Sequence, residues 1–177
     1  TASVIVEHVA GSGVIDDLNS LSAPVNRELT VQQIRLQGRV LLAEDSRDNQ
    51  VLISFLLRRA GAEVDIAENG LVALEMIEKA SLNGIRYELL LTDMQMPEMD
   101  GYSLAHHLRT SGSTLPIIAL TAHAMAEDRK KCTDAGCDDY ASKPIDKSIL
   151  LSLCNKWIGR VGGSSFHPAT TESIESQ

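Results

Sequence analysis

Five short strand-like segments alternate with five amphipathic or charged stretches between residues 39 and 158, and this alternation limits the folds open to the chain. The predicted strands span 40–43, 62–67, 89–91, 116–120 and 138–141. Several of these segments are apolar throughout, which is typical of parallel strands covered on both faces. Short right-handed crossovers between such strands predict a doubly wound α/β fold with a five-stranded parallel sheet and helices on both faces.

The predicted helices span 49–60, about 71–77, 98–109, 126–135 and 146–158. Apolar residues recur at helical spacing in the first of them, and Gly61 ends it. In the last helix Ile149, Leu153 and Trp157 are four residues apart, which places them on one face. The stretch 126–135 is polar and heavily charged, and we expect most of it to face solvent.

Composition excludes several classes of function. The chain has 16 basic and 24 acidic residues, a net charge of −8, and 3% aromatic residues. Such a chain is a poor binder of polyanions and lacks base-stacking surfaces, so we expect no nucleic-acid partner. It has no apolar run near the roughly 20 residues of a membrane helix, so we expect no membrane contact by this segment. Its three cysteines form no CxxC pair, which favours reduced structural thiols and a cytoplasmic location.

The composition changes at two points along the chain. Residues 1–37 are rich in small and turn-forming residues, and we interpret them as a linker or arm from a preceding domain. Residues 38–160 form the predicted domain, and 161–177 read as a flexible C-terminal tail. Because the sequence begins at Thr1, we interpret it as a fragment of a longer protein.

Polar side chains follow several predicted strands at their carboxyl ends. The first strand is followed by Glu44 and Asp45, and the third by Thr92 and Asp93. The fourth ends at Thr121, and Lys143 follows the fifth. In doubly wound sheets the binding site lies at the carboxyl ends of the strands. If the first, third, fourth and fifth strands lie side by side, these groups share one crevice.

Three carboxylates in one crevice repel one another unless a cation lies between them. An all-oxygen set with few protein ligands suits Mg²⁺, which keeps several waters; Mn²⁺ is an alternative. With a metal bound, one carboxylate can attack phosphorus, while Lys143 and the Thr121 hydroxyl supply charge and a hydrogen bond to the transferred group. The pattern therefore predicts phosphoryl transfer driven by positioning and electrostatics.

Four separated motifs now point to one family, in the right order and at the right strand ends. They are LLAEDS at 41–46, LTDMQMPEMDG at 91–101, ALTAHAM at 119–125 and DDYASKP at 138–144. Together they resemble the response-regulator receiver domain of two-component signalling, over about residues 38–160. The resemblance implies a flavodoxin-like fold with strand order 2-1-3-4-5.

The resemblance also implies a role for each site residue. Asp93 is similar to the phosphoacceptor that takes a phosphoryl group from phosphohistidine. Metal ligands are implied at Glu44, Asp45, Asp93 and the main-chain carbonyl of Gln95. Phosphate contact is implied for Lys143, which precedes a proline whose peptide bond is typically cis in this family. The switch residues would be Thr121 and Tyr140.

Among receivers, these motifs most resemble those of hybrid sensor histidine kinases, and the fragment is expected to be the C-terminal receiver of such a kinase. Its expected partner is a histidine kinase core or a histidine phosphotransfer protein. The fragment itself carries no kinase core and would catalyse only its own phosphorylation and dephosphorylation. The parent would be a phosphotransferase that can be anchored to a membrane while this domain stays in the cytoplasm.

Two alternatives remain. One is a hydrolase with an aspartyl-phosphate intermediate, like the haloacid-dehalogenase phosphatases. Those enzymes carry two aspartates around one residue after the first strand, whereas Asp93-Met94-Gln95 lacks the second and follows the third strand. The other is a receiver-like interaction module that is never phosphorylated. The complete acidic set, with Thr121 and Lys143, argues against it.

Overall fold

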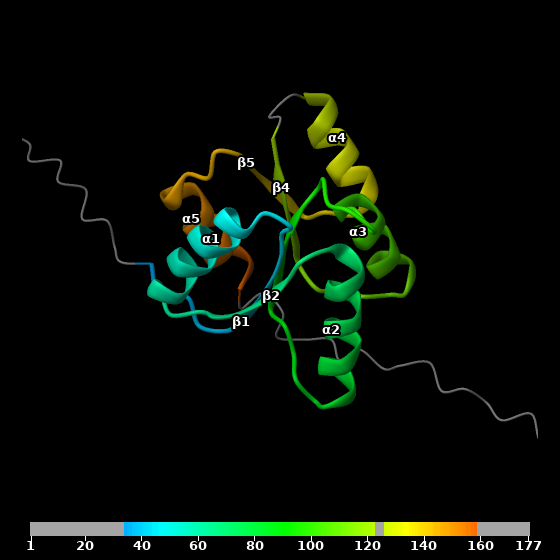
Figure 1. The fold of residues 1–177 in the computed structure, drawn as a ribbon, viewed down its shortest axis with the longest axis horizontal. Helices are drawn as coiled ribbons and strands as arrows, with labels where there is room; N and C mark the ends of the chain where they lie inside the picture. The colour runs from blue at the N-terminus through cyan, green and yellow to red at the C-terminus, as the bar shows by residue number, and fades with distance from the viewer. Residues whose placement is uncertain (1–33, 123–125, 159–177) are drawn as a thin grey trace, which may run out of the picture. The chain divides into compact units, whose positions relative to one another are not determined.

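Five parallel strands form the sheet of the computed structural model, which describes residues 34–122 and 126–158. The order is β2-β1-β3-β4-β5, which confirms the predicted doubly wound, flavodoxin-like fold (Figure 1). The strands are β1 (Arg39–Ala43), β2 (Glu63–Ala67), β3 (Leu89–Asp93), β4 (Ile117–Thr121) and β5 (Asp139–Ser142).

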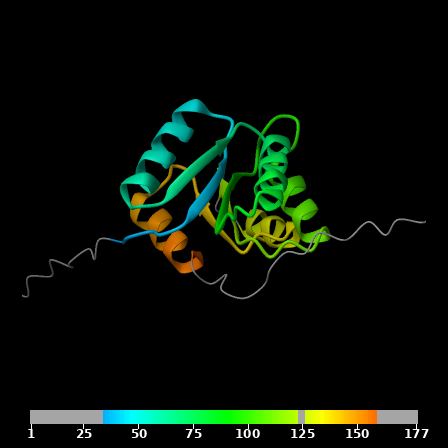
Figure 2. The same ribbon diagram turned by 90° about the horizontal axis from the view of Figure 1, so that it is seen from below.

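Helices cover both faces of the sheet. On one face lie α1 (Arg47–Arg59) and α5 (Lys147–Trp157), and on the other α2 (Gly70–Leu82), α3 (Gly101–Thr110) and α4 (Ala126–Ala135) (Figure 2). Each face has its own apolar core, one around Leu41, Leu90 and Leu104 and the other around Leu42, Leu91 and Ile53. Alternate residues of the central strands serve opposite cores, because side chains in a strand point to opposite faces. In the described part of the chain, no helix is both long and apolar enough to cross a membrane.

One predicted helix start is wrong. The sequence predicts a helix from residue 98, but α3 begins at Gly101. Glu98 has a φ of 64°, outside the helical region. Asp100 is instead the N-cap, and its side chain accepts a hydrogen bond of 2.7 Å from the main-chain nitrogen of Ser103. Residues 98–100 therefore belong to the loop after β3.

In two helices the apolar stripe faces the core only in part: Leu56 of α1 and Leu153 and Trp157 of α5 pack against the core, whereas other residues of the same stripes are exposed. In α1 the buried residues are Ile53, Ser54 and Leu57, whereas Val51, Leu52 and Phe55 are 64%, 47% and 55% exposed. In α5 the core takes Leu150, Leu151 and Cys154, while Ile149 lies outside it. Both helices are apolar on more than one side, so periodicity alone could not decide which side is buried.

The remaining sequence expectations concern the cysteines and the domain boundaries. All three cysteines are free and buried, as expected. Burial raises the pKa of Cys137 and that of Cys154 to about 12, which keeps both as thiols.

Leu36 is also buried, and its main-chain nitrogen donates to the carbonyl oxygen of Ala60. Apart from residues 34–37, the predicted arm lies outside the described residues, as does the predicted tail 161–177.

Candidate functional site

The register of the sheet brings the polar strand ends together. Ala43 pairs with Thr92, so Glu44 and Asp93 leave adjacent strands at the same level. On the other side of β3, Asp93 pairs with Leu120, one residue before Thr121. Thr121 in turn pairs with Ser142, directly before Lys143. Residues far apart in sequence therefore meet at one edge because all five strands are parallel.

Three carboxylates converge at this edge. Glu44, Asp45 and Asp93 each offer an oxygen, and these atoms lie within 4.8 Å of one another. Glu44 is fully buried, Asp93 is 7% exposed, and Asp45 lies at the surface. The group therefore opens to solvent on one side, and three hard oxygen donors with room for water are the ligands that a small divalent cation prefers.

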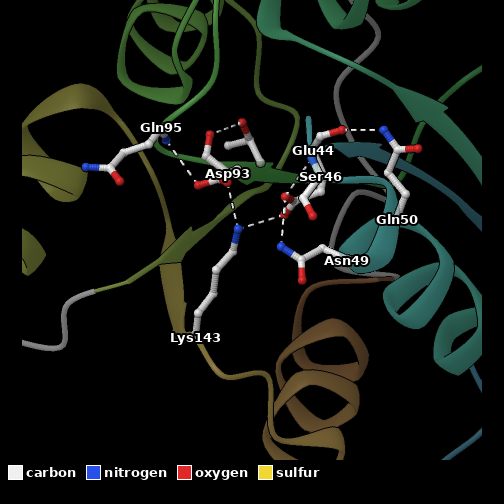
Figure 3. A network of polar contacts seen from close by, with 8 residues as sticks. Glu44, Ser46, Asn49, Gln50, Asp93, Gln95 and Lys143 are labelled. Atoms are coloured by element: carbon white, nitrogen blue, oxygen red, sulfur yellow. Dashed lines mark hydrogen bonds and ion pairs between the residues drawn. The ribbon is translucent and has the colours of Figure 1, made fainter.

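Lys143 lies between two of these carboxylates (Figure 3). Its Nζ is 2.6 Å from Asp93 Oδ2 and 2.8 Å from Glu44 Oε2. Burial alone would lower the pKa of Lys143, but hydrogen bonds to Asp93 and Glu44 outweigh it and raise that pKa above its ordinary value. The ammonium group is therefore held charged beside Asp93. The peptide bond from Lys143 to Pro144 is cis.

The loop after β3 turns tightly around Asp93. The main-chain nitrogen of Gln95 donates to Asp93 Oδ1 at 3.0 Å, so each carboxylate oxygen of Asp93 has one donor among the described contacts. The chain then returns so closely that a Cβ on Gly101 would lie 2.2 Å from the carbonyl oxygen of Asp93. Only glycine fits this approach, which places the start of α3 directly against the end of β3.

Two residues that the sequence analysis did not single out bind Glu44. Asn49 Nδ2 donates to Glu44 Oε1 at 3.0 Å, and Gln50 Nε2 donates to the carbonyl oxygen of Glu44 at 2.6 Å (Figure 3). Both belong to the first turn of α1. Two consecutive amide side chains in the first helical turn after an acidic pair are a sequence signal that could have indicated them.

The two predicted switch residues lie in different surroundings. Thr121 is buried at the end of β4, next to the carboxylates. Tyr140 is half-buried on β5, where it packs against the core shared by α3 and α4 rather than among the carboxylates. The guanidinium carbon of Arg129, on α4, lies 4.7 Å from the centre of the Tyr140 ring. That distance is a cation–π contact.

Comparisons with known proteins agree with this architecture. Residues 40–155 match the family model described as the response regulator receiver domain. The chain is 39% identical over 124 residues to hybrid signal transduction histidine kinase I of Dictyostelium discoideum, covering 68% of this chain and 7% of that protein. It is 38% identical over 126 residues to the sensor protein GacS of Pseudomonas syringae pv. syringae, covering 68% of this chain and 13% of that protein. The chain thus spans only a small part of these relatives.

A solved structure shows the same likeness. The receiver domain of a sensor histidine kinase from Pseudomonas aeruginosa superposes with a TM-score of 0.58 and 35% identity, over 69% of this chain and 98% of that one. That structure has a magnesium ion coordinated in its active-site cleft. With the fold, the converging carboxylates and the family match in agreement, the chain belongs to the response regulator receiver domains of two-component signalling, and its relatives include the receivers of hybrid histidine kinases.

Proposed function

We propose that Asp93 is the phosphoacceptor of this receiver and takes its phosphoryl group from a phosphohistidine. The observation that carries the proposal is the pair of contacts on its carboxylate, Lys143 on one oxygen and the Gln95 amide on the other. A carboxylate oxygen of Asp93 forms the new bond to phosphorus, while the phosphorus–nitrogen bond to the histidine ring breaks. The ring nitrogen keeps that electron pair, and the product is an aspartyl phosphate.

The metal proposed for this reaction is Mg²⁺, with Mn²⁺ as a chemically similar substitute. Glu44, Asp45 and Asp93 would hold it together with the main-chain carbonyl of Gln95, and the three carboxylates lie close enough to share one ion. When bound, the ion neutralises charge on the phosphoryl oxygens and orients them. Support comes from the oxygen-only donor set and from the magnesium-bound relative.

Lys143 and Thr121 complete the proposed reaction site. Lys143 supplies a fixed positive charge beside the attacking oxygen, and the Thr121 hydroxyl lies at the neighbouring strand end. We propose that Thr121 and Tyr140 shift inward after phosphorylation. The added phosphate then biases an existing equilibrium between two arrangements of β4, α4 and β5.

The partner proposed is the histidine-bearing helix of a histidine kinase core or of a histidine phosphotransfer protein. The exposed side of α1 is apolar at Val51, Leu52 and Phe55, and the first turn of this helix borders the carboxylates. An apolar patch beside a reactive centre is suited to a protein that delivers the phosphoryl group. The three free cysteines support a cytoplasmic location for the domain.

The decisive experiment is mass spectrometry after incubation with acetyl phosphate or a phosphohistidine protein and Mg²⁺. We expect one added phosphoryl group on Asp93, absent without Mg²⁺ and absent in Asp93→Asn. Asp138→Asn is the matched control and should label like the wild type, because Asp138 pairs with Arg109 rather than with the site. Labelling that survives Asp93→Asn would refute the assignment. A beryllofluoride titration without any response would instead favour the interaction module.

A further inference from the structure

The Glu44 carboxylate is enclosed, and both of its oxygens accept hydrogen bonds. It has no solvent exposure. Its Oε1 accepts hydrogen bonds from Asn49 Nδ2 at 3.0 Å and from the main-chain nitrogen of Ser46 at 3.3 Å. Its Oε2 accepts from Lys143 Nζ at 2.8 Å (Figure 3). Each oxygen therefore has its own donors, and the two on Oε1 hold the plane of the carboxylate together with Lys143 on Oε2.

The orientation of Glu44 decides where the Lys143 ammonium lies. Lys143 Nζ is shared between Glu44 and Asp93, and a lysine has a flexible four-carbon stem. The last torsion of a glutamate is soft and has no strong intrinsic preference. If the carboxylate turned, the second anchor of Lys143 would move with it. Asn49 provides the shorter of the two hydrogen bonds that prevent this turn.

A role in starting the helix does not explain the direction of the Asn49 side chain. Ser46 is the N-cap of α1, and its side chain makes no capping hydrogen bond. Asn49 is the third residue of the helix, from which side chains commonly reach back to the N-cap amide. Here the Ser46 main-chain amide donates to Glu44 Oε1 instead, and Asn49 Nδ2 donates to the same oxygen. Gln50, one residue later, binds the main chain of Glu44.

We propose that Asn49 is a positioning residue for phosphoryl transfer, acting through Glu44 on Lys143; this inference rests on the proposed function of Asp93. The Asn49 amide holds Glu44 Oε2 toward Lys143, which keeps the ammonium group at the attacking carboxylate. An uncharged amide is suited to this place, because it adds a donor without adding a positive charge that would compete with a divalent ion.

A double-mutant cycle tests the route from Asn49 to Lys143. The initial rate of Asp93 phosphorylation by acetyl phosphate is measured at saturating Mg²⁺ for the wild type, Asn49→Ala, Lys143→Ala and the double variant. We expect Asn49→Ala to slow the wild type about tenfold, the loss expected for one hydrogen bond to a charged group. In the Lys143→Ala background, Asn49→Ala should change the rate less than twofold, because the ammonium group that Asn49 helps to position is absent. Equal slowing in both backgrounds would overturn the inference.

A second readout needs neither metal nor phosphoryl donor. In NMR spectra of the metal-free protein, the two Hε signals of an immobilised lysine are distinct, whereas those of a freely rotating one merge. We expect distinct Lys143 Hε signals in the wild type and in Asp48→Ala, and merged signals in Asn49→Ala and Asn49→Asp. Asp48 is the matched control, since it is an exposed residue in the first turn of α1. Distinct signals in both Asn49 variants would contradict the positioning role.

The two proposals fail in different ways. If the wild type takes up no phosphoryl group, the function assigned to Asp93 is wrong, and the inference about Asn49 fails with it. If the wild type is labelled but the rate effect of Asn49→Ala is independent of Lys143, only the inference about Asn49 fails. Asn49→Asp keeps the shape of the side chain while placing a negative charge beside Glu44, so a folded Asn49→Asp protein that reacts as fast as the wild type also refutes the inference.

Discussion

Lys143 Nζ lies 2.6 Å from Asp93 Oδ2, close enough for a charge-assisted hydrogen bond to the carboxylate that we propose as phosphoacceptor. The same nitrogen binds the fully buried Glu44. One side chain from the end of the fifth strand therefore joins the ends of the first and third. This arrangement places positive charge at the site before any phosphoryl group arrives.

Replacing Lys143 by alanine should separate metal binding from phosphoryl transfer. We expect the affinity for Mg²⁺, measured by calorimetry, to stay within a few-fold of the wild type or to increase, because a competing cation is removed. The rate of phosphorylation by acetyl phosphate should fall about 100-fold, as is typical when one preorganised donor to transition-state charge is lost. Lys147→Ala, an exposed change at the start of α5, is the control. An unchanged rate in Lys143→Ala would exclude the proposed charge role.

Replacing Phe55 by glutamate should impair delivery of the phosphoryl group while sparing the chemistry. Phe55 is 55% exposed on α1 and contributes to the apolar patch near the site. We expect transfer from a phosphohistidine protein to slow at least tenfold, since a charge would be buried at the contact, whereas labelling by acetyl phosphate should match the wild type. Leu82→Glu is the control, because Leu82 is 81% exposed on α2. If both variants transfer equally fast, the α1 patch is not the docking site.

Replacing Arg129 by alanine should favour the arrangement of β4, α4 and β5 that phosphorylation is proposed to stabilise. Its guanidinium lies over the Tyr140 ring, and an exposed cation–π contact stabilises by about 0.5–1 kcal/mol. If this contact holds Tyr140 in its present place, Arg129→Ala should lower the beryllofluoride concentration needed for half-maximal response about two- to fivefold. The signal of fluorotyrosine at Tyr140 reports the change. The control is Lys130→Ala, which removes an exposed pair with Asp134. A higher requirement for beryllofluoride would contradict the prediction.

Replacing Gly101 by alanine should disturb the site through the main chain of Asp93. The added Cβ would meet the carbonyl oxygen of Asp93 at 2.2 Å, so α3 and the end of β3 must move apart. Overpacking of this kind costs about 1–3 kcal/mol in the free energy of unfolding, measurable by urea denaturation, and should weaken Mg²⁺ binding. Gly112→Ala meets nothing within 4 Å, although its φ of 80° adds strain of its own. A Gly101→Ala protein with wild-type stability and Mg²⁺ affinity would show that the loop adapts freely.

Sequence patterns were sufficient for the fold class and for the site residues at the strand ends, while the strand order came from the family resemblance. Buried parallel strands must be apolar, and their polar neighbours must lie at the strand ends, so both leave a local signature at Glu44, Asp93 and Thr121. The start of α3 was harder to predict. Pro97 favours a helix start near Glu98, and only the backbone at Glu98 and the Asp100 cap show where the helix begins.

Three-dimensional packing decided the features that depend on which residues become neighbours. Helix α1 is apolar on more than one side, so its sequence could not show which side faces the core. Packing against the sheet buries the side that carries Ile53 and Leu57. The bonds from Lys143 to Glu44 and to Asp93 likewise exist only once the parallel strands are in register. Periodicity along a chain records how each element is patterned, whereas contacts across 50 or 99 residues arise from how the elements are arranged.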